Sequence, residues 1–90
     1  MINPYTEPEL SICVLDFCKP YESRFLLESI RRHIKIPHRI IFCDNGSNEE
    51  YPVKFLRDGL IDQLIINKEA LWHLHFACLL LLRNLACFYP

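Results

Sequence analysis

Apolar residues recur along positions 1–69 as three short, mostly apolar runs. The runs LSICVL, RIIFC and LIDQLIIN have the length of strands, and they lack the strict alternation of a strand with one wet face. Each run ends at or just before a polar residue, which is Asp16, Asp44 and Asn67 in turn. The pattern therefore predicts three strands in a sheet that is buried on both faces.

The first interval between these runs, KPYESRFLLESIRRHIK, has the spacing of a helix. Pro20 suits a helix start, and Pro37 ends the segment. The cations at 31–35 suit the negative end of a helix dipole. Four apolar residues fall on helical spacing: Phe25, Leu26, Ile30 and Ile34.

The second interval, SNEEYPVKFLRDG, also predicts a helix. Ser47 or Asn48 can cap its start, and Glu49 and Glu50 suit its first turn. Gly59 suits its end. Strands and helices then alternate as β-α-β-α-β, which predicts an α/β fold with a short parallel sheet and right-handed crossovers.

The last 21 residues, 70–90, differ in kind, because only one of the 21 Lys, Arg, Asp and Glu residues lies among them. A membrane span is the weaker interpretation, since His and Asn residues and Arg83 interrupt the apolar run. We expect an apolar C-terminal helix that completes a Rossmann-like, three-layer fold. The chain then divides into a polar leader at 1–9, an α/β unit at 10–69 and an atypical tail at 70–90.

Composition limits the function classes. The chain has 90 residues, of which 51% are apolar, and a net charge of −1, which together predict one soluble domain or part of one. Without a basic excess, nucleic acid is not expected as a partner. Five cysteines form no CxxC pair, and the N-terminus lacks the features of a signal peptide. These features predict a reduced, cytoplasmic protein in which Cys13 and Cys43 are buried.

Candidate chemistry gathers at the predicted strand ends. The two glycines of the chain cannot form a GxGxxG turn or a GxxxxGK[ST] loop. In parallel sheets ligands bind outside the carboxyl ends of strands, where Asp16, Asp44 and Asn67 are expected. Asp44 has two interpretations: its carboxylate accepts hydrogen bonds from a nucleobase or ribose, or it accepts from the backbone of Gly46 or Ser47 in a turn.

Three other chemistries are weaker. Asp16 and Asp44 suit a magnesium site of a phosphotransfer receiver, but the third strand ends in Asn67 instead of Asp. His73, His75 and Cys78 spell HxHxxC, which suggests a zinc site. Residues two apart point to different faces of a helix, however, and the sequence has no second cluster of metal ligands. Cys18 is a plain thiol unless a base lies near it.

With these residues in hand, positions 10–69 resemble the N-terminal part of family 2 glycosyltransferases and other enzymes of the GT-A fold. SICVLDFCKP is similar to the opening strand of that family, often S-[IV]-[IV]-[IV]-P-T-[YF]-N-R-P. IIFCDNGSNEE is similar to its [IV]-[IV]-V-D-[ND]-[GN]-S-x-D turn. The second motif is the more specific of the two.

The resemblance implies that residues 10–69 are the nucleotide-sugar-binding half of a GT-A-like domain. It implies that Phe17 lies near the base, that Asp44 binds the nucleoside, and that Asp16 and Asn45 belong to the same site. Asp16 stands where the family often has Thr. For a complete family member the resemblance also implies Mg²⁺ or Mn²⁺ on the donor diphosphate.

The chain departs from the family in what it lacks. It contains no DxD motif for the metal, and the later acidic base that activates an acceptor hydroxyl is also missing. We therefore expect this chain to bind donor weakly and to catalyse nothing. The abrupt loss of charge at residue 70 leads to the hypothesis of a truncated or frame-shifted gene product, and the alternative is a shortened domain in which the tail covers the sheet as a helix. The alternative function is a non-catalytic α/β interaction module that associates with a partner or a second copy through its apolar tail.

Overall fold

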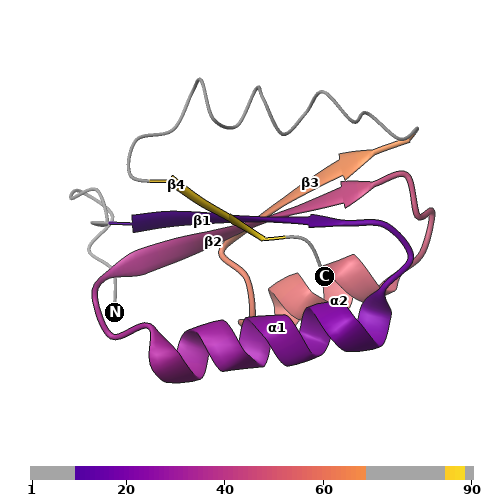
Figure 1. The fold of residues 1–90 in the computed structure, drawn as a ribbon. Coiled ribbons are helices and arrows are strands. Elements are labelled where there is room, and N and C mark those ends of the chain that lie inside the picture. The colour runs from indigo at the N-terminus through magenta and orange to yellow at the C-terminus, as the bar shows by residue number, and fades with distance from the viewer. Residues whose placement is uncertain (1–9, 69–84, 89–90) are drawn as a thin grey trace.

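The computed structural model describes residues 10–68 and the backbone of residues 85–88. The strands form one four-stranded sheet in the order β3-β2-β1-β4, and every neighbouring pair is parallel (Figure 1). The elements are β1 (Leu10–Asp16), α1 (Pro20–His33), β2 (His38–Asn45), α2 (Tyr51–Arg57), β3 (Gln63–Asn67) and β4 (Leu85–Phe88). The predicted α/β fold with a parallel β-α-β-α-β unit is confirmed.

Both helices lie on the same face of the sheet, so the described residues form two layers (Figure 1). The third layer was expected from a C-terminal helix over 70–90, most of which lies outside the described residues. Its described part corrects that expectation, because Leu85–Phe88 is strand β4, hydrogen-bonded to β1. A short apolar run such as the one at 85–88 has no periodicity that separates helix from strand, and pairing with β1 decides the outcome.

Helix α1 begins at Pro20, as predicted, and has two arginines and a histidine in its last turn. Its buried face consists of Ser23, Leu27 and Ile30, which are spaced at i, i+4 and i+7. Phe25 was predicted on the apolar stripe, but its side chain is 77% exposed. The buried stripe is therefore rotated away from Phe25.

Helix α2 begins at Tyr51, later than predicted. Neither Ser47 nor Asn48 caps it: Glu50 occupies the cap position, and no side chain makes a capping hydrogen bond. The predicted end is confirmed, since Gly59 has a φ of 78°. The amide of Leu60 donates to Phe55 O at 3.0 Å and that of Gly59 to Leu56 O at 3.2 Å, which is the Schellman pattern.

The apolar core lies on both faces of the sheet. The face toward the helices packs buried residues of β1 and β2 against both helices, and Phe42 meets Phe55 edge to face with ring centroids 5.5 Å apart. The opposite face holds a second buried cluster: Cys13, Leu15, Ile41 and Cys43. The prediction that Cys13 and Cys43 are buried is confirmed. Among residues 10–68 and 85–88, no helix has the length and hydropathy needed to span a bilayer.

Candidate functional site

The polar ends of the three predicted strands are aligned at one edge of the sheet. Asp16 of β1 is the register partner of Asp44 of β2, and Asn45 of β2 is the register partner of Asn67 of β3. Because the strands are parallel, these residues share the carboxyl edge. The expected gathering of Asp16, Asp44 and Asn67 is therefore present in the fold.

The strand order adds a topological feature to this edge. The chain moves from β1 through β2 to β3 in one direction, and β4 then lies on the other side of β1. The order therefore reverses beside β1. Open parallel sheets bind ligands at the carboxyl edge where such a reversal occurs. In this chain that point lies where β1 ends, at Asp16 and Phe17.

Asp16 lies at the centre of a buried hydrogen-bond network. Asp16 is 2% exposed, and its Oδ1 accepts a hydrogen bond from Ser23 Oγ of α1 at 2.6 Å. Its Oδ2 accepts a hydrogen bond from the hydroxyl of Tyr51, the first residue of α2. Both carboxylate oxygens are thus engaged by the protein. Asp16 connects β1 to both helices, and it positions the edge through these contacts.

Tyr51 connects the two loops that leave this edge. Its hydroxyl accepts a hydrogen bond from the amide of Lys19 at 3.2 Å and lies 3.3 Å from Ser47 Oγ. Burial, and then the hydrogen bond to Asp16, raise the pKa of Tyr51 well above its usual range, although the Ser47 and Lys19 contacts oppose the rise. The phenol therefore stays protonated at neutral pH and remains a donor to Asp16.

The loops after β1 and β2 are also joined directly. The amide of Cys18 donates to Ser47 Oγ at 2.7 Å. Cys18, Gly46 and Asn48 all have a positive φ, of 54°, 88° and 57°, in this pair of loops. Such a conformation is costly for Cys, and more readily adopted by Asn and Gly. Strained backbone of this kind concentrates at functional sites, which makes these loops candidates for ligand contact.

Asp44 makes the turn contact that was one of its two interpretations. Its Oδ1 accepts a hydrogen bond from the amide of Ser47 at 3.3 Å, and the residue is 1% exposed. Asn45 is buried beside it, at 2% exposure. A carboxylate has capacity for several hydrogen bonds, so the turn contact leaves the second interpretation, nucleoside binding, as a prediction.

Two further side chains complete the edge. Phe17 follows Asp16 directly and is 46% exposed, which makes it the accessible aromatic residue among the predicted site residues. The side-chain nitrogen of Asn67, Nδ2, is buried and has no hydrogen-bond partner in the described part of the chain. A buried amide donor without an acceptor costs free energy. Asn67 therefore contributes an amide donor to this edge, and that donor is closed to solvent in this structure.

The described part of this edge has few free ligands for a divalent cation. No cluster of three or more His, Cys, Asp or Glu side chains that could bind a metal exists among residues 10–68. Both oxygens of Asp16 already accept hydroxyl hydrogen bonds. The magnesium-receiver interpretation of Asp16 and Asp44 therefore finds no support in the geometry. The HxHxxC segment at 73–78 lies outside the described residues.

Sequence reasoning missed two members of the network and misjudged a third. Ser23 and Tyr51 were not singled out, and Ser47 was expected to cap α2 instead of joining the loops. A polar residue on the buried stripe of α1, one turn before Leu27, is the signal that marks Ser23. Tyr51 contacts Asp16 across 35 positions of sequence, and no local pattern encodes that contact.

One surface pocket is formed by α2 and the residue before it. It is lined by Glu50, Val53, Lys54 and Arg57, and it contains none of the predicted site residues.

We compared the chain with known proteins, and no protein-family model, curated protein or solved structure matches it.

Proposed function

We propose that the carboxyl edge of the sheet binds the nucleoside part of a nucleotide-sugar donor, and that the chain is a glycosyltransferase-like protein. The observation that carries the proposal is the strand order, which reverses beside β1 at Asp16 and Phe17. The DNGS turn after β2 supports it, because the turn resembles the nucleoside-binding turn of family 2 glycosyltransferases and its Asp44 is in register with Asp16.

In this proposal the residues at the edge have separate roles. Phe17 stacks against the base, because it is an exposed aromatic side chain at the strand end. Asp44 accepts hydrogen bonds from the ribose hydroxyls or from a base N–H group. Asn45 and Asn67 supply neutral polar groups on the neighbouring strands. Asp16 is a positioning residue, because its oxygens hold Ser23 and Tyr51.

Access to Asp44 requires the turn after β2 to move. Asp44 and Asn45 are nearly closed to solvent, so a ligand reaches them only when the Ser47 amide releases the carboxylate. Gly46 and Asn48, with their positive φ values, flank Ser47 in this turn. Binding is therefore expected to change the environment of the Gly46, Ser47 and Asn48 amides together.

The proposal concerns binding, and no transfer step is assigned to these residues. Sugar transfer in the resembled family requires a cation on the diphosphate and a base for the acceptor. The family residues that supply them have no match in this sequence. The chain is therefore expected to bind nucleoside diphosphates weakly and to show no sugar transfer of its own.

The test is titration of the isotopically labelled chain with UDP and with GDP, followed by nuclear magnetic resonance with and without Mg²⁺. We expect shifts at Phe17 and across 44–48. Asp44→Asn keeps an oxygen acceptor for the Ser47 amide and removes the charge, so it should weaken binding about tenfold or more. Asp62→Asn is the matched control, because it removes an aspartate charge at the opposite edge.

Either of two results would overturn the proposal. A folded chain with no shifts for either nucleotide has no nucleoside site. Equal weakening by Asp44→Asn and Asp62→Asn would mean that Asp44 has no specific role in binding, because the loss of one negative charge should by itself favour an anionic diphosphate. In the first case the interaction module becomes the leading function. Light scattering then tests it, since a discrete dimer is expected of a module and heterogeneous aggregates are expected of a fragment.

A further inference from the structure

The amino edge of the sheet, opposite the candidate site, carries a concentrated positive charge. The segment 31–39 has four formal cations and two histidines, and it contains no Asp or Glu. This contrasts with a net charge of −1 for the whole chain. We call this surface the basic edge: Arg31, Arg32, His33, Lys35, His38 and Arg39.

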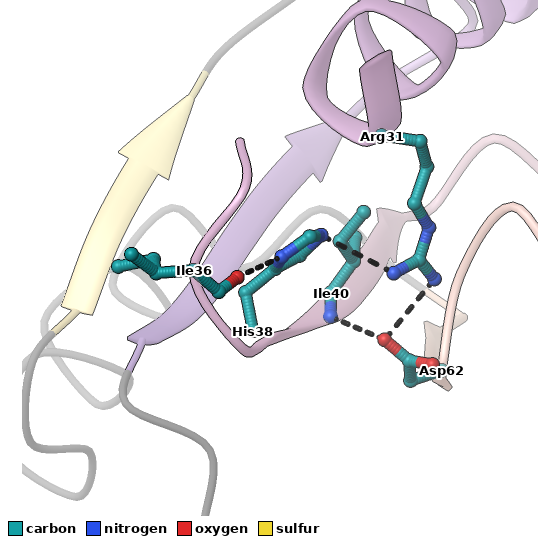
Figure 2. Close-up of polar contacts among 5 residues, drawn as sticks. All are labelled: Arg31, Ile36, His38, Ile40 and Asp62. Carbon is teal, nitrogen blue, oxygen red and sulfur yellow. Dashed lines mark hydrogen bonds and ion pairs between the residues drawn. The ribbon is translucent and has the colours of Figure 1, made fainter. Parts of the chain in front are cut away.

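The fold holds the basic edge in a defined conformation (Figure 2). Arg31 Nη2 lies 3.1 Å from Asp62 Oδ2, and Arg31 Nη1 lies 3.4 Å from His38 Nε2. His38 Nδ1 lies 2.9 Å from the carbonyl oxygen of Ile36. The amide of Leu10, at the start of β1, donates to Pro37 O at 3.2 Å. These contacts fix the loop between α1 and β2 against the strands.

Two of the remaining cations face solvent, whereas Arg39 is partly buried and its Nε donates to Ser11 Oγ at 2.9 Å. Arg32 and Lys35 are exposed, and neither forms an ion pair with any acidic side chain of residues 10–68. Arg31 is the one residue of the basic edge that pairs with a described carboxylate, that of Asp62. Within the described residues, Arg32 and Lys35 therefore carry unpaired positive charge that suits an external partner of negative charge.

An exposed apolar side chain, that of Ile36, lies among the residues of the basic edge. Ile36 is 48% exposed, directly follows Lys35, and its side chain points away from His38 (Figure 2). Exposed cations around an apolar residue are the combination that suits an anionic bilayer surface, where the charge meets headgroups and the apolar group enters the interface. Single-stranded nucleic acid would instead favour aromatic residues for stacking among the cations. The exposed Tyr21 and Phe25 lie in the first turns of α1, and the basic edge begins in its last turn.

We propose that the basic edge docks the protein onto membranes that contain anionic phospholipid. Arg32 and Lys35 contact the headgroups, and Ile36 enters the interface between them. The carboxyl edge, with the candidate site, lies at the other end of the strands. The proposal does not depend on nucleotide binding, because none of its residues belongs to that site.

The test is co-sedimentation of the full chain with vesicles of phosphatidylcholine alone and of phosphatidylcholine mixed with phosphatidylserine. We expect binding to the anionic vesicles that weakens as salt is added. The double variant Arg32→Gln/Lys35→Gln should bind them about 25-fold less tightly, at about fivefold for each cation. Ile36→Ser should lose about threefold and keep the salt dependence.

The matched control is Lys54→Gln/Arg57→Gln, which removes two exposed cations from the last turn of α2 and leaves the same net charge. This control should bind the anionic vesicles within about twofold of the unmodified chain. Equal loss in the two double variants would overturn the proposal, since only net charge would then matter. Equal binding to both vesicle types would also overturn it.

A parallel titration with a fluorescent oligonucleotide tests nucleic acid as the alternative partner. Binding of the oligonucleotide that depends on Arg32 and Lys35, together with no preference for anionic vesicles, would replace the membrane with nucleic acid as the partner. Far-ultraviolet circular dichroism of each variant establishes that it is folded. Arg32 and Lys35 are exposed, so their replacement by Gln should leave the fold intact.

Discussion

Asp16, at the carboxyl edge of the sheet, and Asp62, at the amino edge, each connect α1 to the strands. Asp16 accepts a hydrogen bond from Ser23 near the start of the helix, and Asp62 pairs with Arg31 near its end. Their surroundings differ, since Asp16 is 2% exposed whereas the Asp62 side chain is 37% exposed. One helix is thus held by a buried network at one end and by a solvated ion pair at the other.

From this comparison we expect burial, more than the number of contacts, to determine how much each network contributes to the free energy of unfolding. Each aspartate has two partners in the described residues. At the buried end, removal of the Asp16 carboxylate leaves the hydroxyls of Ser23 and Tyr51 without an acceptor. Water reaches these buried hydroxyls poorly, so each one adds a desolvation penalty to the folded state. At the exposed end, water replaces the lost partner and salt screens the pair. The loss in the free energy of unfolding should therefore be larger for substitutions of more deeply buried side chains.

Asp16→Ala should have the largest effect. It removes the acceptor of both Ser23 and Tyr51 at once, and we expect a loss of about 3 kcal/mol in the free energy of unfolding. Urea denaturation measures the loss. Asp16→Asn is the control, because its one carbonyl oxygen retains an acceptor and should limit the loss to about half. A loss below about 1 kcal/mol for Asp16→Ala would contradict the ranking by burial.

Tyr51→Phe should have the next largest effect, because it removes one donor and keeps the ring in the core. We expect a loss of about 1.5 kcal/mol at neutral pH. The raised pKa of Tyr51 adds a pH dependence. The phenol titrates near pH 10 in the unfolded chain and at higher pH in the folded one, so the stabilisation is complete below pH 10 and declines as the pH rises further.

The pH dependence is measured as the difference between the two proteins. The unmodified chain should lose stability relative to Tyr51→Phe above about pH 10, with a slope of at most about 1.4 kcal/mol per pH unit. Other groups that titrate in this range are present in both proteins and cancel in the difference. Parallel stability curves through this range would mean that Tyr51 is not held as a donor to Asp16.

Asp62→Asn should lower the free energy of unfolding by less, about 0.5 kcal/mol, because the Arg31 and Asp62 side chains are 27% and 37% exposed and the amide oxygen still accepts from Ile40 N. The Asp62 carboxylate extends the strand ladder: it accepts from Ile40 N at 2.7 Å, while the Asp62 amide donates to Ile40 O at 2.9 Å. Asp62→Ala removes that acceptor and should cost about 1 kcal/mol. High salt should reduce the effect of Asp62→Asn and leave that of Asp16→Ala unchanged.

The sequence predicts the strands and helices whose ends form the carboxyl and amino edges of the sheet. The first two predicted strands end at Asp16 and Asp44 within one residue of the observed ends, and Pro20 and Gly59 mark the observed helix limits. These signals are local, because apolar runs, a proline at a helix start and a glycine after a helix end each act within a few residues. Local signals therefore place Asp16 and Asp44 at the carboxyl edge.

The contacts within each edge are not predictable in the same way. Asp16 meets Tyr51 across 35 positions, and Arg31 meets Asp62 across 31. Such pairs arise from the packing of helices onto the sheet, and no spacing rule encodes them. β4 is a further case, since Leu85–Phe88 lies in an apolar segment whose strand identity depends on its pairing with β1. The predicted roles of Phe17, Asp44 and Asn45 in nucleoside binding await the titration.

Glu28→Gln should have the smallest effect, and it sets the baseline of the comparison. Glu28 pairs with Arg24 one turn away on α1 at 3.0 Å, and the two side chains are 44% and 52% exposed. Arg24 also lies 3.9 Å from Asp58, so it keeps a partner when the Glu28 charge is removed. We expect a loss of about 0.3 kcal/mol by urea denaturation, falling toward zero in high salt. A loss equal to that of Asp62→Asn would show that Asp62 acts as an ordinary surface charge, and that the amino edge is held by its backbone ladder alone.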